Sequence, residues 1–280
     1  MNILITGGNG FIGRNIIEFF ASKYKLFSPS HTELDLLDTN SVDQFFGKNI
    51  IDVVIHCANV GGKRNDDKNI NILNTNLRIF SNLLKNQTKF GKMIYFGSGA
   101  EYDKSRDIAN IKESDFGNNI PVDDYGLYKY ICSKLIENTN NIYCLRLFGV
   151  YGKYEDISVR LISNLISNYI LKQPLTINQD CLFEYLYIDD FVKILEFFIH
   201  NSPKERFYNV GTGVQYRLLD LASIVNRLGD YSTPIIVKNP GMNKEYTSNC
   251  DKLKSIIPNL TYTPIETGIN DLYQFYLRNL

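Results

Sequence analysis

Apolar runs of strand length alternate with segments of helical periodicity through the first half of the chain. The first run covers residues 2–6, and apolar positions recur at helical spacing over residues 15–20. Later strands are predicted at 25–30, 51–55, 92–96 and 142–147, with helices between them at 41–46, 71–84 and 124–137. This regular alternation predicts an α/β fold built on a doubly wound parallel sheet.

A glycine-rich turn joins the first strand to the first helix. Gly7, Gly10 and Gly13 follow the apolar run at a spacing that lets the backbone come close to a pyrophosphate. The first amides of the next helix, with the positive end of its dipole, face that charge. The segment therefore predicts a Rossmann dinucleotide site.

Beyond Gly152 the alternation loosens. Residues 1–152 are expected to form mainly an NAD(P)-binding Rossmann domain. Residues 153–280 are expected to form mainly a smaller C-terminal substrate-binding lobe, which covers the carboxyl edge of the sheet, closes a cleft and returns some segments to the sheet. In this half, helices are predicted at 159–171, from 189 onward and at 218–228, and strands at 184–188 and 206–210.

Composition narrows the range of partners. The chain has 280 residues, 44% of them apolar, and thirty basic residues balance thirty acidic ones. We therefore expect no nucleic acid and no membrane as partner. No apolar run reaches the roughly 18 residues of a membrane span, and the N-terminus lacks the features of a signal peptide, so a cytoplasmic protein is expected. The five scattered cysteines favour buried thiols, and no metal site is predicted.

The end of the second predicted strand selects the cofactor. In a Rossmann unit, an Asp or Glu there binds the ribose 2′-hydroxyl of NAD. This chain has Ser28, Ser30 and His31 at these positions, with no carboxylate among them to repel a 2′-phosphate. NADPH is therefore the expected cofactor, with NADH as the alternative.

Three polar residues are expected to meet at the carboxyl edge of the sheet. Ser98 follows the fourth strand, and Tyr125 and Lys129 share one face of a helix. A nearby ammonium lowers the pKa of a tyrosine from about 10. Tyr125 can then exchange a proton with a substrate oxygen to which Ser98 donates a hydrogen bond. His56 ends an apolar strand, where a structural hydrogen bond is the more common role.

The Tyr-x-x-x-Lys pair alone is not specific, because Tyr130 and Lys134 repeat its spacing. A longer series of motifs is specific: TGGNGFIG, HCAN, FGSGAEY, YGLYKYICSKLIE, LRLFGVYG, EYLYIDD and FYNVGTG occur in this order. Over essentially its whole length the chain resembles the extended short-chain dehydrogenases/reductases of the NAD(P)-dependent nucleotide-sugar epimerase/dehydratase family. ELDLLD, ANVGG and GSGAEY are most similar to the branch of GDP-fucose synthases and 4-keto-6-deoxy-sugar reductases.

The resemblance implies a role for each residue at a matching position. Ser98, Tyr125 and Lys129 would be catalytic, and Lys129 would also bind the nicotinamide ribose. Many relatives pair through a four-helix bundle, so a homodimer is expected. The implied cofactor-binding residues are Gly7, Gly10, Phe11, Ile12, Gly13, Ser30, Asp35, Leu36, Cys57, Ala58, Asn59, Asn76, Tyr125, Lys129 and Leu147. Those implied for the substrate are Ser98, Gly99, Ala100, Gly149, Lys153, Phe183 and Arg217.

Departures from the family pattern refine the predicted activity. GDP-fucose synthases also epimerise C3 and C5, with a cysteine two residues after the catalytic serine and a histidine in a later helix. Ala100 stands at the first position, and residues 159–171 include no histidine. Because alanine transfers no proton, reduction without epimerisation is predicted. Dehydratases carry Asp-Glu in the serine loop. Here Gly99 and Ala100 replace that pair and Glu101 lies one position further on, which argues against dehydration.

The substrate side departs as well. The usual Asn of the Asn-x-Tyr-Gly turn is Gly149, and the usual Arg before the EYLYIDD string is Phe183. Both normally contact the nucleotide sugar. The diphosphate is then expected on Lys153, Arg160 or Arg217, unless the ligand is not a nucleotide sugar.

Together these features predict an NADPH-dependent C4-reductase of a nucleotide-linked 4-keto-6-deoxy hexose or heptose. It would serve capsule or lipopolysaccharide synthesis, without C3/C5 epimerisation. An NAD-dependent nucleotide-sugar 4-epimerase is one alternative. A non-catalytic NADP-binding regulatory or scaffold protein is the other.

Overall fold

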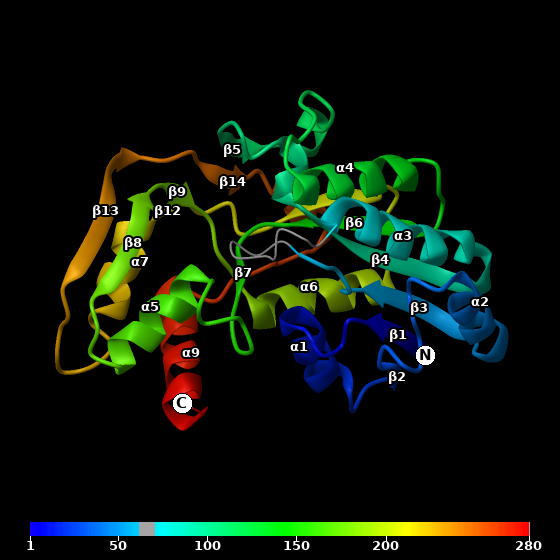
Figure 1. The fold of residues 1–280 in the computed structure, drawn as a ribbon, viewed down its shortest axis with the longest axis horizontal. Coiled ribbons are helices and arrows are strands. Elements are labelled where there is room, and N and C mark those ends of the chain that lie inside the picture. Colours follow the sequence, from blue (N-terminus) through cyan, green and yellow to red (C-terminus); the bar gives the residue numbers. More distant parts are fainter. Residues whose placement is uncertain (62–70, 280) are drawn as a thin grey trace.

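A six-stranded parallel sheet forms the centre of the molecule, in the order β11-β6-β4-β3-β1-β2 (Figure 1). The computed structural model describes residues 1–61 and 71–279, so Gly62 of the ANVGG motif lies outside the described residues. The predicted α/β fold with a doubly wound parallel sheet is confirmed. The strands are β1 (Asn2–Thr6), β2 (Lys25–Phe27), β3 (Ile51–His56), β4 (Phe90–Ser98), β6 (Ile142–Leu147) and β11 (Phe207–Val210).

Helices cover both faces of this sheet (Figure 1). The helices α1 (Phe11–Phe20) and α6 (Ile188–His200) lie on one face, and α2 (Thr39–Lys48), α3 (Ile72–Lys85) and α4 (Asp124–Ile136) on the other. Successive residues of β1 serve the two faces, since Ile3 and Ile5 belong to the core beneath α1 and α6, whereas Leu4 belongs to the core beneath α2 to α4. Strands buried on both sides need uninterrupted apolar runs, which is why the sequence pattern revealed them.

The carboxyl ends of four strands form one edge. β1 pairs with β2 on one side and with β3 on the other. The connection from β1 to β2 and the connection from β2 to β3 therefore run in opposite directions along the sheet, and a crevice opens at this point. The register aligns Thr6 with His56 and Ser98 with Leu147. Residues from β1, β3, β4 and β6 therefore meet at this edge.

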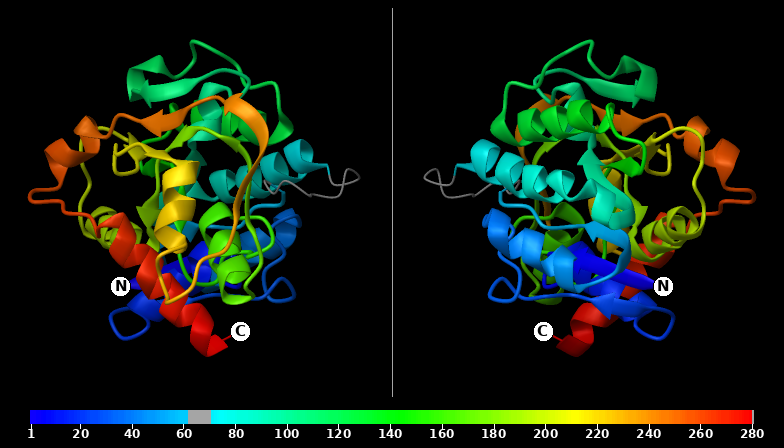
Figure 2. Two further views of the ribbon diagram at one scale, coloured as in Figure 1. Left: turned by 90° about the vertical axis from the view of Figure 1, so that its left-hand side faces the viewer. Right: turned by 90° about the vertical axis from the view of Figure 1, so that its right-hand side faces the viewer.

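A second, smaller lobe has a core of its own, centred on Leu165, Leu221 and Ile269. Figure 1 shows it beside the sheet, and in the left view of Figure 2 it faces the viewer. Its helices are α5 (Leu161–Ile170), α7 (Leu218–Val225) and α9 (Ile265–Asn279). Its strands form a pair, β8 (Leu175–Asp180) with β13 (Ile235–Met242), and a sheet in the order β12 (Tyr216–Arg217), β9 (Leu182–Phe183), β14 (Tyr246–Ser248), β5 (Ile108–Ile111).

The two parts of the chain exchange segments. From the second half, α6, β11 and α8 (Asp251–Ile256) pack on or join the central sheet, while β5 from the first half joins the sheet of the lobe.

The prediction of a single strand at 184–188 is wrong in detail. The structure has β9 and, separately, β10 (Leu186–Tyr187), which pairs with β7 (Val150–Tyr151). The remaining elements are 3-10 turns η1 (Gln87–Lys89), η2 (Gly99–Tyr102) and η3 (Glu113–Asp115). Within the described residues, no helix has the length and apolar content needed to cross a membrane.

Candidate active site

A cleft of about 810 Å³ lies between the sheet edge and the smaller lobe. Residues from both parts of the chain line it. The predicted catalytic residues Ser98, Tyr125 and Lys129 all belong to this lining, as do Phe11, Ile12, Cys57, Asn59 and Leu147 from the predicted cofactor set. The structure therefore brings residues predicted from separate motifs into one cavity.

Lys129 brings a buried positive charge to the cleft. Its side chain is 6% exposed, and its Nζ donates to the carbonyl oxygen of Phe96. The ammonium lies 4.8 Å from the ring centroid of Tyr95 and 5.9 Å from that of Tyr125. Aromatic faces stabilise a cation at such distances. Lys129 is therefore held beside the phenol with which the sequence paired it.

His56 does not act as a second charge at this site. Its Nδ1 lies 2.7 Å from Oγ1 of Thr6, across the β1–β3 pair. Burial, helped by the charge of Lys129, lowers the pKa of His56 to about 3. The imidazole is thus neutral at physiological pH, in keeping with the structural role expected of a histidine that ends an apolar strand.

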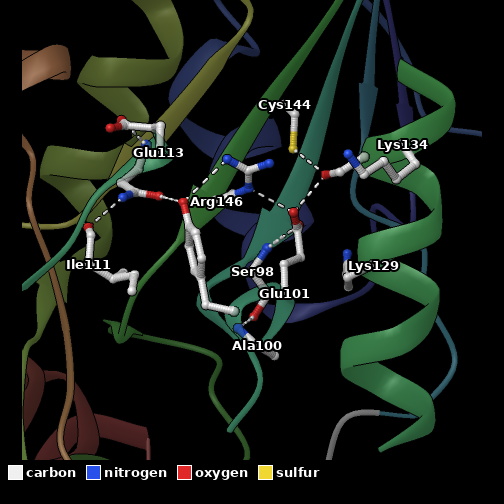
Figure 3. A network of polar contacts seen from close by, with 12 residues as sticks. Ser98, Ala100, Glu101, Ile111, Glu113, Lys129, Lys134, Cys144 and Arg146 are labelled. Carbon is white, nitrogen blue, oxygen red and sulfur yellow. Dashed lines mark hydrogen bonds and ion pairs between the residues drawn. The ribbon is translucent and has the colours of Figure 1, made fainter. Parts of the chain in front are cut away.

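A buried polar network fixes the turn that carries Ser98 (Figure 3). Ser98 is the N-cap of η2, and its backbone N–H donates to Oε1 of Glu101 at 2.9 Å. Oε2 of Glu101 accepts from Nε of Arg146 at 2.7 Å and from Ser133 at 2.6 Å. Glu101 is 0% exposed and Arg146 is 1% exposed. With its carboxylate committed to this network, Glu101 is not placed to eliminate water from a substrate. The sequence had shown only its displacement from the dehydratase position.

The turn after β1 fits a pyrophosphate. Gly10 is the N-cap of α1 and brings no side-chain hydrogen bond to the first turn of this ten-residue helix. A Cβ on Gly13 would lie 2.4 Å from the carbonyl oxygen of Gly7, so only glycine permits this close packing of turn and helix. Gly7, Gly10, Phe11, Ile12 and Gly13 are therefore the residues that would hold the phosphates.

Other predicted cofactor residues shape the loops around the crevice. Asn76 clamps the loop after β3, since its side chain accepts from Val60 N at 2.8 Å and donates to Val60 O at 2.7 Å. Ala58 packs against Gly7.

In the loop after β2, the Ser30 amide and hydroxyl both donate to Glu33, at 2.7 and 2.8 Å. Positions 28, 30 and 31 carry no carboxylate, as the sequence shows, but the structure brings that of Glu33 into the same loop.

Asp35 and Leu36 lie in the next turn. Asp35 accepts from Leu37 N at 2.9 Å, and its own amide donates to Ser41. Leu36 O accepts from Asn82 at 2.8 Å. These bonds fix the segment that would flank the adenine.

The predicted substrate residues separate into two groups. Ala100, Gly149 and Phe183 line the cleft, whereas Lys153 pairs with Glu18, and Arg217 donates to Asp180 at 2.8 Å. Lys153 and Arg217 are not brought together with the predicted catalytic residues. The third candidate for the diphosphate, Arg160, does line the cleft.

At position 149, glycine is required by the packing. A Cβ there would lie 1.9 Å from the carbonyl oxygen of Glu184, and φ is +53°. The asparagine expected from the resemblance therefore cannot occupy this backbone position without displacing β10 and its preceding residues.

Sequence reasoning missed several lining residues. Tyr246 places its hydroxyl 3.5 Å from Oγ of Ser98. Lys104, Arg106 and Lys244 add cations to the lining. No motif marked these residues, because they come from loops and a short strand whose approach to the cleft depends on tertiary structure.

Across residues 1–61 and 71–279, no group of three or more His, Cys, Asp or Glu side chains is placed to hold a metal ion.

A family model described as "NAD dependent epimerase/dehydratase family" matches residues 3–211. The chain belongs to this family. The match confirms the resemblance seen in the motifs, and with it a nicotinamide dinucleotide as the class of cofactor.

Proteins similar to this chain include several that are named for sugar nucleotides. GDP-L-colitose synthase of Yersinia pseudotuberculosis is 25% identical, over 99% of this chain and 98% of the relative. The structure of GDP-mannoheptose C4 reductase from Campylobacter jejuni with NADP bound has a TM-score of 0.85 at 20% identity, covering 99% of this chain and 98% of that one. UDP-glucose 4-epimerase of Thermus thermophilus, in complex with NAD, also has a TM-score of 0.85 at 20% identity, with both chains fully covered. At these identities the solved structures establish the fold.

Proposed function

We propose that the chain is an NADPH-dependent C4-reductase of a nucleotide-linked 4-keto-6-deoxy hexose or heptose, serving capsule or lipopolysaccharide synthesis. The observation that carries this proposal is the presence of Ser98, Tyr125 and Lys129 in one cleft beside the dinucleotide turn. A hydroxyl donor, a phenol and a buried ammonium are the groups that reduction of a carbonyl requires.

The bound nicotinamide would supply a hydride to C4. Ser98 would donate a hydrogen bond to the C4 oxygen, and Tyr125 would give that oxygen its proton as negative charge develops on it. Lys129, 5.9 Å from the Tyr125 ring centroid, would stabilise the phenolate that remains. The network of Glu101 and Arg146 would keep Ser98 in place throughout.

A diphosphate fits the cations of the lobe side. Arg160, Lys104, Arg106 and Lys244 line the cleft and can replace Lys153 and Arg217 as its ligands. Lys244 also donates to the carbonyl oxygen of Ser105, which ties this residue to the Lys104–Arg106 loop. Cations beside the Ser98, Tyr125 and Lys129 site suit a sugar carried on a nucleoside diphosphate.

The absence of C3/C5 epimerisation is part of the proposal. Ala100, within the η2 turn that Ser98 caps, carries no acid or base, and α5 contains no histidine. The carboxylates of Glu155 and Glu245 line the cleft but accept hydrogen bonds from Ser163 and from Gln215, at 2.7 and 2.8 Å. The alanine at position 100 and the absence of a histidine from α5 support reduction without epimerisation.

The test is oxidation of NADPH, with NADH in parallel, against freshly made GDP-, CDP- and dTDP-4-keto-6-deoxy sugars. Stoichiometric oxidation with one sugar nucleotide would support the reductase. Tyr125→Phe should lower the turnover number at least about 100-fold, while Tyr130→Phe, which alters the second Tyr-x-x-x-Lys pair, should leave it unchanged.

Other outcomes would contradict the proposal. Interconversion of 4-hydroxy sugar nucleotides by protein with bound NAD, without net oxidation, would establish the epimerase instead. Full activity in Tyr125→Phe would exclude Tyr125 as proton donor. If the wild type neither reduces nor interconverts any sugar and yet binds NADPH, the regulatory or scaffold alternative gains support.

A further inference from the structure

Tyr246 reaches the catalytic serine from a distant part of the chain. It begins β14 in the smaller lobe, 148 residues beyond Ser98, and its hydroxyl lies 3.5 Å from Oγ of that serine. This distance is long for a hydrogen bond between hydroxyls. Contacts of this kind in unliganded active sites commonly shorten when the substrate binds.

The ring of Tyr246 is held on two sides. It stacks on Phe183, with centroids 4.9 Å apart and an interplanar angle of 17°, and it packs at 5.1 Å against Phe148. Its backbone pairs with that of Phe183 in the β14–β9 ladder, and its carbonyl accepts from Glu184 N at 3.3 Å. Phe183, which replaces the arginine expected from the resemblance, therefore supports the ring that points at Ser98.

Gly99 leaves space for the Tyr246 hydroxyl. A Cβ on Gly99 would lie 2.5 Å from this oxygen and 2.4 Å from the ring of Phe148. Any side chain at position 99 would displace one of the two aromatic residues. The glycine after the catalytic serine and the tyrosine from the lobe are thus matched to each other.

The hydrogen bonds available to the Ser98 hydroxyl indicate what the contact with Tyr246 would do. A serine hydroxyl can accept two hydrogen bonds and donate one. Oγ of Ser98 already accepts from Ala100 N at 3.1 Å. A second bond, from Tyr246, would occupy the other lone pair, so that the remaining proton of Ser98 is available only to a group in the cleft.

Tyr246 remains a donor over the working pH range. Burial raises its pKa, as do the negative charges of Glu184 and Glu101, while the contact with Ser98 acts in the opposite direction. The interaction with Tyr125 raises the pKa of Tyr246 as well. The phenol therefore keeps its proton.

We propose that Tyr246 is a positioning residue, which donates to Oγ of Ser98 and thereby directs the serine proton to the C4 oxygen of the substrate. This inference rests on the proposed reductase function. It goes beyond it by assigning to the smaller lobe a part in setting the direction of the Ser98 hydrogen bond.

The kinetic test uses Tyr246→Phe, which removes the hydroxyl and keeps the aromatic stack. We expect kcat to fall about tenfold, the effect of one lost hydrogen bond, with KM changed less than about twofold. Tyr262→Phe is the matched control, because Tyr262 is a tyrosine whose buried hydroxyl has no hydrogen-bond partner among the described residues. In a Ser98→Ala background, single-turnover rates should not change further on adding Tyr246→Phe.

Two kinetic outcomes would overturn the inference. Equal kcat in wild type and Tyr246→Phe would remove any role in the reaction. A full tenfold effect that persists in the Ser98→Ala background would show that Tyr246 acts on the substrate directly and not through the serine. In both cases the wild type would still be a reductase, so the proposed function would stand.

A second measurement needs no substrate. Fluorotyrosine placed at position 246 should show a fluorine NMR resonance that shifts in Ser98→Ala and not in Ser223→Ala, a serine on α7 bonded to Leu219 O. A resonance that does not respond to Ser98→Ala would refute the contact. If the wild type reduced none of the sugars, the proposed function would fail and this spectrum would still decide whether Tyr246 bonds Ser98.

Discussion

At the scale of single residues, a buried ammonium lies beside a neutral imidazole. Lys129 is buried against Phe96 O and the ring of Tyr95, while His56, close to the same ammonium, has its pKa lowered to about 3. Two adjacent buried cations would repel each other strongly. His56 is therefore neutral and adds no positive charge beside Lys129.

Glu33 provides a test of coenzyme choice. Its carboxylate is held by Ser30, in the loop where a 2′-phosphate would lie. Serines at this position favour NADPH, but a negative charge beside them opposes a phosphate. Glu33→Gln should therefore raise the ratio of kcat/KM for NADPH to that for NADH by about threefold, the size of an exposed, screened charge effect. Glu196→Gln, on α6, is the control, and an unchanged ratio in Glu33→Gln would argue against this placement of the phosphate.

Glu184 should give the fold a specific pH dependence. Burial raises its pKa to about 7, although Ser248 donates two hydrogen bonds to its carboxyl, at 2.6 and 3.1 Å. The folded state then binds a proton that the unfolded state releases near pH 4.5. The contribution of Glu184 to stability is therefore present below pH 4.5 and falls as pH rises to 7, by up to about 3 kcal/mol.

Denaturation of wild type and Glu184→Gln from pH 5 to 8 measures this effect. Because glutamine resembles the protonated acid, the variant should gain stability relative to the wild type as pH rises. Glu137→Gln, in a surface pair with Lys134, should show no such trend. Parallel pH curves for wild type and Glu184→Gln would mean that the pKa of Glu184 is not raised.

At the scale of elements, the η2 turn depends on partners from α4 and β6. Glu101 joins Ser98 N, Ser133 and Arg146 within the core, so the serine that we propose as catalytic is fixed by a buried ion pair (Figure 3). Removing one partner of such a pair leaves the other charge buried without compensation. The proposed active site therefore depends on the whole turn and not only on the serine.

Glu101→Met should destabilise the protein by about 3–5 kcal/mol. Glu137→Met breaks an exposed pair and should cost less than about 1 kcal/mol. Urea denaturation of the two variants compares them directly. If both lose the same small free energy, the Glu101–Arg146 pair does not hold the turn as proposed.

Sequence patterns predicted the elements better than their long-range partners. Periodicity located β1, β3, β6 and α4 within about two residues, because burial on one or both faces imposes a local pattern. It did not indicate that β14 pairs with β5 and β9, or that Glu101 meets Arg146, since these partners are separated by long stretches of chain. The Tyr246–Ser98 contact was not predicted for the same reason.

At the scale of the molecule, the cleft depends on segments that cross between its two parts. β5 carries the chain after η2 into the sheet of the smaller lobe, and β14 returns Tyr246 to Ser98. The cations Lys104 and Lys244 lie on the same two connections. Movement of the lobe would therefore alter the phosphate side and the Ser98 side of the cleft together.

The outer surface of α4 suggests how two copies would associate. Leu127, Ile131 and Leu135 recur at four-residue spacing on this helix, half-buried or, for Leu135, 37% exposed, and none of them belongs to the hydrophobic cores of the described residues. The neighbouring α3 adds the half-buried Leu77. An apolar stripe on two adjacent helices fits the four-helix dimer that the family resemblance implies.

We expect light scattering to give twice the chain mass for the wild type. Ile131→Glu should shift the protein to the monomer, because two glutamates would meet across the two-fold axis of such a dimer. Ile236→Glu, on the exposed strand β13, should leave the dimer intact. Circular dichroism would show whether Ile131→Glu remains folded. A wild-type monomer at micromolar concentration, or an Ile131→Glu dimer, would place the contact elsewhere or exclude it.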